Sequence, residues 1–115
     1  MAYRPRLLEV LRDTIIGTVQ RYGPDLTCRQ LAVLLVCSLE DSPQTVRGLA
    51  RLLRTPKPAI TRAIDRLEKF GLAKRAPDKR DRRSVLISPT EAGRAFTKEL
   101  HGMMTVASAG QTSGA

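Results

Sequence analysis

The sequence predicts a mainly α-helical fold with one small β-hairpin, an α+β architecture. Two observations predict it: apolar residues recur at helical spacing in segments that open on capping residues, and two short strand-like runs flank a charged stretch near residue 80. With 115 residues, of which 42% are hydrophobic, the chain can form one domain around one core. We expect that domain to span residues 1–107.

Two helices are predicted before the charged region. The first spans residues 5–22. Its apolar stripe consists of Leu8, Leu11, Ile15, Val19 and Tyr22. The second helix opens at Thr27, which forms a capping box with Gln30, and it continues to Leu39 with almost no polar face. We therefore expect the second helix to be mostly buried.

Residues 45–70 predict two further helices joined by a turn. Thr45 is the expected N-cap of the first, which runs through Arg54. Its expected packing face consists of Leu49, Ala50, Leu52 and Leu53. Thr55 is the expected N-cap of a longer helix, with Pro56 at its first position, and this helix runs to residue 70.

A β-hairpin is predicted after these helices. Gly71 stands where a helix C-terminus favours glycine, and residues 72–87 form two strands around a charged loop. Together with residues 45–70, the hairpin predicts a winged helix-turn-helix. Ser88 opens a capping box for a last helix over 89–107, and residues 108–115 are expected to form a disordered tail.

The positive charge is concentrated between Arg47 and Arg83. Thirteen of the 20 lysines and arginines lie there with only four of the 11 acidic residues, and the rest of the chain has seven of each sign. Charge of one sign confined to one segment is typical of a protein that binds a polyanion, and a solvated basic surface is the alternative. The aromatic content of 3% argues against single-strand binding, which stacks bases on aromatic rings.

The helix over 56–70 has the pattern of a recognition helix for the major groove of duplex DNA. Ile60, Ile64 and Leu67 recur at i, i+4 and i+7 and form an apolar back. The residues nearest the N-terminus reach furthest into the groove, so the expected base contacts are Lys57, Pro58, Thr61 and Arg62. For Arg62, bidentate binding of guanine and a phosphate contact are both open.

Other basic residues are expected to hold the protein on DNA without reading sequence. Arg66 and Lys69 are expected to bind phosphate or to pair with Asp65 and Glu68 within the helix. Expected contacts to the DNA backbone come also from Arg47, Arg51 and Arg54.

The loop of the hairpin is too charged to pack against an apolar surface. Arg80 and Arg82 are the expected contacts to a narrow minor groove, where the negative potential is enhanced. Asp78 and Asp81 are expected to hold the arginines or to accept main-chain hydrogen bonds within the turn.

These residues resemble the winged helix-turn-helix of the MarR family of bacterial transcriptional regulators, over roughly residues 27–100. The segments that match are Leu49-Ala50, residues 57–68, Gly71-Leu72, the wing pattern of Asp78, Arg80, Asp81 and Arg83, and Thr90-Glu91-Ala92-Gly93-Arg94. The resemblance implies major-groove contacts from Lys57, Thr61 and Arg62 and a minor-groove contact from Arg80. It also implies that Asp81 and Arg83 have structural roles in the wing. From the charge pattern we expect the same role for Asp78.

The resemblance also implies a sequence-specific regulator, most simply a repressor, that acts as a homodimer. Residues 5–22 and 89–107 are the candidate dimerisation helices because both carry apolar stripes, and a monomer is the alternative. Typical members have longer terminal helices and a further C-terminal helix, and their phenolic-ligand pocket lies between the dimerisation helices and the DNA-binding lobe. The terminal helices predicted here are shorter, so we assign no small-molecule effector. A protein-interaction module and an architectural or replication-associated DNA binder are the alternative functions.

The sequence lacks patterns for catalysis, metal or cofactor binding. His101 is the single histidine, expected at the surface, and no phosphate-cradling glycine loop or nucleophile motif is present. No apolar run approaches the roughly 18 residues of a membrane span. We therefore expect a protein without enzymatic activity or cofactor, located in the cytoplasm with the nucleoid and not bound to a membrane.

The two cysteines lie on one predicted helix, about 13 Å apart, which is too far for a disulfide. Cys37 is expected in the core. Cys28 is the candidate for redox sensing, since a thiol at a helix N-terminus beside an arginine is more easily deprotonated. An unreactive surface thiol is the alternative for Cys28.

Overall fold

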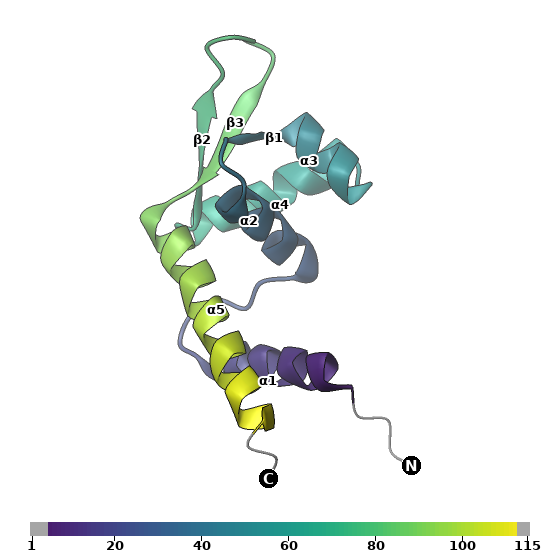
Figure 1. Cartoon of the computed structure of the whole chain (residues 1–115). Coiled ribbons are helices and arrows are strands. Elements are labelled where there is room, and N and C mark those ends of the chain that lie inside the picture. Colours follow the sequence, from purple (N-terminus) through teal and green to yellow (C-terminus); the bar gives the residue numbers. More distant parts are fainter. Residues whose placement is uncertain (1–4, 113–115) are drawn as a thin grey trace. The chain divides into compact units, whose positions relative to one another are not determined.

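The computed structural model describes residues 5–112, with the backbone alone at 111 and 112, and confirms a mainly α-helical fold with a small antiparallel sheet (Figure 1). In chain order the elements are α1 (Arg6–Gln20), α2 (Cys28–Leu39), β1 (Gln44–Thr45), α3 (Val46–Leu53), α4 (Lys57–Lys69), β2 (Ala73–Pro77), β3 (Val85–Pro89) and α5 (Glu91–Thr112). No helix in this range is long and apolar enough to cross a bilayer.

The chain divides into two compact units. One unit, here called the sheet unit, spans residues 26–97, and the other, the helical unit, combines residues up to 25 with residues from 98 onward. The main hydrophobic core lies wholly within the sheet unit. The helical unit has buried residues of its own, which are Val10, Thr14, Leu100 and Ala107.

The sheet has three antiparallel strands in the order β1-β3-β2 (Figure 1). β2 and β3 are the two strands of the predicted hairpin, and their register pairs Ala73 with Pro89 and Pro77 with Val85. β1 was not predicted. It consists of Gln44 and Thr45, which pair with β3 next to the start of α3, and two residues are too few to show the alternating pattern of a strand.

The predicted apolar back of α4 is confirmed, and it forms part of the core of the sheet unit. Ile60, Ile64 and Leu67 are fully buried. They belong to a core cluster that also contains Val33 and Leu34 of α2 and, further along the chain, Leu49 and Ile87. Burying a side chain of this size stabilises the fold by about 1.5 to 3 kcal/mol.

Short-range capping signals placed three helix ends correctly. Gln30 N–H donates to Thr27 Oγ1 at 3.1 Å and Thr27 N–H donates to Gln30 Oε1 at 3.0 Å, which completes the predicted capping box. Gly48 N–H donates to Thr45 Oγ1 at 2.9 Å. Gly71 has a φ of +75° and ends α4, as predicted for a glycine in the left-handed region.

Two predicted caps were wrong. The N-cap of α4 is Pro56 and not Thr55, because the Thr55 hydroxyl donates to the Leu53 carbonyl oxygen at 2.9 Å. The N-cap of α5 is Thr90 and not Ser88, because β3 continues through Pro89; the Thr90 hydroxyl accepts from Gly93 N–H at 3.0 Å.

The outer helices end at other residues than predicted. α1 ends at Gln20, so Tyr22 lies beyond the helix and is fully exposed. α5 continues to Thr112, so the predicted disordered tail is wrong for residues 108–112, and residues 113–115 lie outside the described residues. The predicted tail is held in part because Arg6 donates to the Ser108 carbonyl oxygen at 3.0 Å.

α1 packs on the C-terminal part of α5 through the side that carries Val10, Thr14 and Gly17, and not through its predicted apolar stripe. A Cβ atom on Gly17 would lie 3.3 Å from Met103 Sδ, and Arg21 forms an ion pair with Glu99 at 2.9 Å. The residues of the stripe are exposed: Leu8, Leu11, Ile15 and Val19. The helical unit therefore presents an apolar surface that a single chain leaves uncovered.

Candidate nucleic-acid interface

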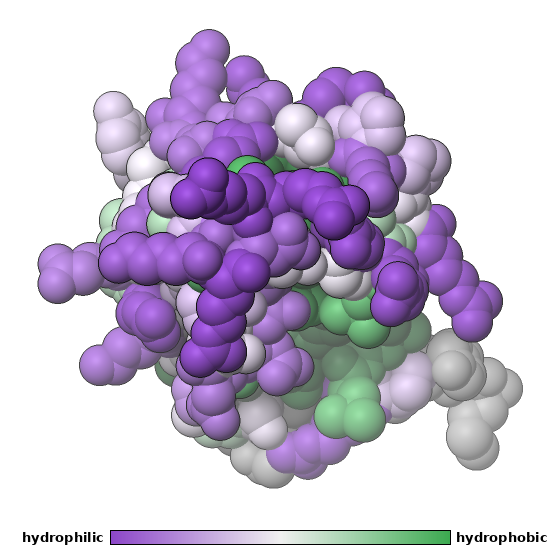
Figure 2. All heavy atoms as spheres, turned by 90° about the horizontal axis from the view of Figure 1, so that it is seen from above, coloured by the Kyte–Doolittle hydropathy of each residue, from purple (hydrophilic) through white to green (hydrophobic). Residues whose placement is uncertain are grey.

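All ten residues that the sequence nominated for DNA contact lie exposed on the sheet unit. They are Arg47, Arg51, Arg54, Lys57, Pro58, Thr61, Arg62, Arg66, Arg80 and Arg82. From above, in the orientation of Figure 1, hydrophilic side chains gather over the hairpin and α3 (Figure 2). The folded unit therefore presents these groups to solvent, where a polyanion can reach them.

α4 combines a buried back with an exposed front. Lys57 is its first residue, and Thr61 and Arg62 follow about one turn later on the exposed side. Ile60 and Ile64 lie on the opposite side, in the core. The front near the helix N-terminus is thus free for contact while the core holds the helix in place.

The turn between α3 and α4 is tight. Arg54 adopts a left-handed conformation with a φ of 50°, and Thr55 N–H donates to the Ala50 carbonyl oxygen at 3.0 Å. The expected packing face of α3 was wrong at Leu52, which is 60% exposed. Leu53 and Ala50 lie about 40° and 100° to one side of the buried Leu49, whereas Leu52 lies about 60° to the other side, away from the packing face.

Arg75 on β2 is the residue that sequence reasoning missed. Its guanidinium donates to Asp65 Oδ1 at 2.7 Å and to Glu68 Oε1, and so joins the wing to the front of α4. Arg66 and Lys69 were expected to bind phosphate or to pair with these carboxylates. Arg66 instead lies over the Phe70 ring, 5.0 Å from its centroid.

The environment of Arg75 raises its pKa. Burial alone would lower it, but hydrogen bonds and attraction from Asp65 and Glu68 outweigh that effect. The signal available in the sequence was a pair of acids three residues apart on one helix face, followed after the Gly71 turn by an arginine. Only the fold shows that β2 brings Arg75 back alongside that face.

Both wing acids bind main-chain groups. Asp78 Oδ1 accepts from Arg80 N–H at 2.9 Å, and Asp81 Oδ1 accepts from Arg83 N–H at 3.0 Å. Asp81 Oδ2 also accepts from the Ser84 hydroxyl at 3.4 Å. These bonds order the backbone of the loop and leave the side chains of Arg80, Arg82 and Arg83 exposed.

A cleft of about 180 Å³ joins the three parts of this surface. It is lined by Arg47 of α3, Lys57 of α4 and Arg83 of the wing loop, together with Thr45, Val46, Ser84 and Val85. The sequence assigned these three cations to three different roles. The structure brings them to one place.

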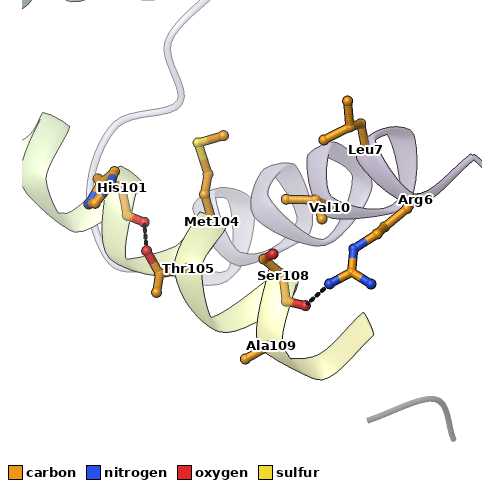
Figure 3. Close-up of a pocket in the computed structure, with 8 residues that line it drawn as sticks. All are labelled: Arg6, Leu7, Val10, His101, Met104, Thr105, Ser108 and Ala109. Carbon is orange, nitrogen blue, oxygen red and sulfur yellow. Dashed lines mark hydrogen bonds between the residues drawn. The ribbon is translucent and has the colours of Figure 1, made fainter. Parts of the chain in front are cut away.

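The helical unit has a separate open hollow of about 540 Å³ between α1 and α5 (Figure 3). The residues drawn there are Arg6, Leu7, Val10, His101, Met104, Thr105, Ser108 and Ala109. His101 is exposed, as predicted, and its carbonyl oxygen accepts from the Thr105 hydroxyl at 3.0 Å. Within residues 5–112, no three histidine, cysteine or acidic side chains gather as they would around a metal ion.

Both cysteines are free thiols in the described chain. Cys37 is buried, as predicted, and burial raises its pKa to about 11, so it stays protonated near neutral pH. Cys28 is the first residue of α2 and is exposed. Of the two, only Cys28 is open to reagents in the folded chain.

Comparison with known proteins points to one family. A model of the MarR family matches residues 22–84. The transcriptional activatory protein BadR of Rhodopseudomonas palustris is 39% identical over 80 residues, which cover 68% of this chain and 46% of that protein. The transcriptional repressor NicR of Pseudomonas putida is 33% identical over 86 residues, which cover 74% of this chain and 53% of that protein.

The fold is also shared with a solved protein–DNA complex. The S. aureus MepR–DNA complex aligns with a TM-score of 0.78 at 17% identity, over 90% of this chain and 82% of that chain. At this identity the likeness concerns the fold. The present chain spans about half the length of the curated relatives it matches.

Proposed function

Because this chain belongs to the MarR family, we propose that it binds double-stranded DNA at specific sequences and regulates transcription. The observation that carries the proposal is the exposed basic surface of the sheet unit, built from α3, the front of α4 and the wing. The MepR structure that shares this fold is a complex with DNA, which supports the same use of the surface here.

In the proposed complex, the N-terminal part of α4 enters the major groove. Lys57, Pro58, Thr61 and Arg62 then stand nearest the bases. Arg66 lies further along the helix, beside the backbone. Arg47, Arg51 and Arg54 contact phosphates and set the register of α4, which fixes the position of the protein without reading the sequence.

The wing reaches the neighbouring minor groove in this proposal. Asp78 and Asp81 order the loop through its main chain, so that Arg80 and Arg82 can extend from a defined turn. An arginine inserted into a narrow minor groove is favoured by the enhanced negative potential there. The wing therefore increases the affinity for DNA, and it favours DNA sequences whose minor groove is narrow.

Replacing Arg62 with alanine is expected to flatten base preference, because a bidentate contact to guanine contributes roughly 1 to 3 kcal/mol of discrimination. Replacing Arg51 with alanine is the matched control, since it removes an exposed arginine from α3 and should weaken binding to all duplexes about equally. Affinities for a selected site and for random duplex DNA measure both. The reverse outcome would mean that the two helices have exchanged roles.

Replacing Arg75 with methionine is expected to weaken DNA binding by about tenfold, equal to about 1.4 kcal/mol. The change leaves the carboxylates of Asp65 and Glu68 unpaired on the helix that faces the phosphates, and it releases the wing from α4. The loss of folding stability should be about 1 kcal/mol or less, because all three side chains are partly exposed.

Lys74→Met is the control for this experiment, because Lys74 is exposed on the same strand and carries the same charge. Fluorescence anisotropy with a labelled duplex would compare the two variants. An equal loss of affinity in both would show that total charge, and not the contact between wing and helix, explains the effect of Arg75.

We also propose that the protein represses transcription as a homodimer, by occupying promoter DNA. The exposed apolar stripe of α1 supports a partner on the helical unit, and a second copy of the chain provides a matching apolar surface. The curated relatives include both a repressor and an activator, and repression by occlusion needs no further contact with the transcription machinery. We likewise propose that its function is regulatory and not enzymatic, and that it acts at the chromosome in the cytoplasm.

The dimer proposal predicts a solution mass twice that of one chain. Leu11→Asp places a charge in the exposed stripe of α1 and should give the mass of a single chain, whereas Gln20→Asp, at the exposed end of the same helix, should leave the dimer intact. Light scattering after size exclusion measures both. A monomeric wild-type chain would favour the alternative of a protein-interaction module, which leaves this surface for a different partner.

A further inference from the structure

The cleft in the sheet unit has the composition of an anion site. Arg47, Lys57 and Arg83 come from α3, α4 and the wing loop, and no acidic residue lines the cleft with them. None of the three takes part in an ion pair within residues 5–112. Like charges gathered at one cleft repel one another, and an anion bound among them offsets that repulsion.

The two hydroxyl groups of the cleft each take part in one hydrogen bond within the chain. Thr45 Oγ1 accepts the N–H of Gly48 at 2.9 Å, and the Ser84 hydroxyl donates to Asp81 at 3.4 Å. The guanidinium and ammonium groups add donors that carry a full positive charge. These groups favour phosphate oxygens, which two arginines can bind in bidentate fashion.

Arg83 is the residue whose role changes. The resemblance to the MarR family implied that Arg83 stabilises the wing. In the structure, its main-chain N–H donates to Asp81, while the residue is exposed and is one of those that line the cleft. The wing turn therefore does not depend on the guanidinium, which is left to bind a ligand.

We propose that Arg47, Lys57 and Arg83 together hold one backbone phosphate of bound DNA; the proposal rests on the DNA-binding function proposed above. The cleft lies between the start of α4, placed in the major groove, and the end of the wing loop next to β3; Arg80 and Arg82 of the same loop are placed in the minor groove. A single sugar-phosphate strand separates adjacent grooves, so that strand passes over the cleft. The bound phosphate fixes the wing and α4 at one register on that strand.

This assignment also moves Lys57 from base contact to phosphate contact. A phosphate contact weakens binding to all sequences about equally when it is lost, and it carries no base preference. Specific and random duplexes should therefore lose the same factor of affinity when Lys57 is replaced. The bases near the start of α4 are then left to Thr61 and Arg62.

The dependence of affinity on salt tests the proposal, because it counts the phosphates that a protein neutralises. Each phosphate contributes a slope of about −0.9 in log K against log salt concentration. If the three cations share one phosphate, a variant with Arg47→Gln, Lys57→Gln and Arg83→Gln should have a slope smaller in magnitude by about 0.9. The probe is a short duplex of random sequence, titrated with the full chain.

Other outcomes overturn the proposal. A decrease of about 2.7 would mean that the three residues bind three separate phosphates, and an unchanged slope would mean that the cleft does not touch DNA. Arg82→Gln is the control, because it removes an exposed cation outside the cleft. Combined with the triple variant, it should reduce the magnitude of the slope further. Thermal unfolding by circular dichroism confirms that each variant folds. A wild-type chain that binds no duplex would overturn the DNA-binding function itself, and the phosphate site with it.

Discussion

Replacing Gly93 with alanine is expected to destabilise the sheet unit by about 3 kcal/mol, because the added methyl group has no space. A Cβ atom at this position would lie 2.0 Å from the carbonyl oxygen of Leu72 and 3.3 Å from Leu34 Cδ1. The carbonyl group cannot rotate away freely, since the same oxygen accepts from Thr90 N–H at 3.1 Å. The first turn of α5 would have to shift away from the start of the wing.

Gly102→Ala is the matched control for this experiment. Gly102 lies on the same helix, and a Cβ atom there meets nothing within 4 Å. That substitution should stabilise the protein by up to about 1 kcal/mol, since alanine favours a helix more than glycine does. Chemical denaturation of the two variants measures the difference. Equal stabilities would contradict the close approach of α5 to Leu72.

Replacing Ile64 with alanine is expected to destabilise the protein by about 2 to 5 kcal/mol and to abolish DNA binding as α4 loses its support. Ile64 is 0% exposed and lies in the core cluster behind the exposed front of the recognition helix. The substitution removes three carbon atoms and leaves a cavity that a rigid helix and sheet cannot close completely. Folding and binding should therefore be lost together.

Two controls separate this effect from a change in surface chemistry. Ile64→Val removes one methylene group at the same position and should destabilise by only about 0.5 to 1.5 kcal/mol, with DNA binding retained. Leu52→Ala removes a large side chain from the 60% exposed position on α3 and should leave stability nearly unchanged. If Ile64→Ala were as stable as Leu52→Ala, the proposed core of the sheet unit would be wrong.

The sequence predicted those parts of the fold that depend on neighbouring residues. The capping box of Thr27, the cap at Thr45 and the glycine at 71 each act within one helical turn, and all three were placed correctly. The apolar back of α4 was also predicted correctly, because residues at i, i+4 and i+7 lie on one face of a helix. Errors occurred where two local signals compete, as at Ser88 and Thr90, where pairing with β2 extends β3 through Pro89.

The features that could not be predicted depend on contacts between distant residues. β1 forms because Gln44 and Thr45 pair with the free edge of β3. Arg75 contacts Asp65 because β2 runs back alongside α4. The division into two units likewise follows from which surfaces pack together. For the candidate site, the sequence identified which residues are exposed on the helix front, but it could not show that Arg47, Lys57 and Arg83 share one cleft.

The most direct test of the account is to incubate the protein with sheared DNA from its source genome at roughly physiological salt, then to recover and sequence the bound fragments. A sequence-specific dimer predicts enrichment of a pseudo-palindromic site whose half-sites lie about one helical turn apart, because each copy of α4 then meets the same face of the duplex. Bound fragments with the same sequence composition as the input would contradict the claim that this basic surface reads DNA sequence.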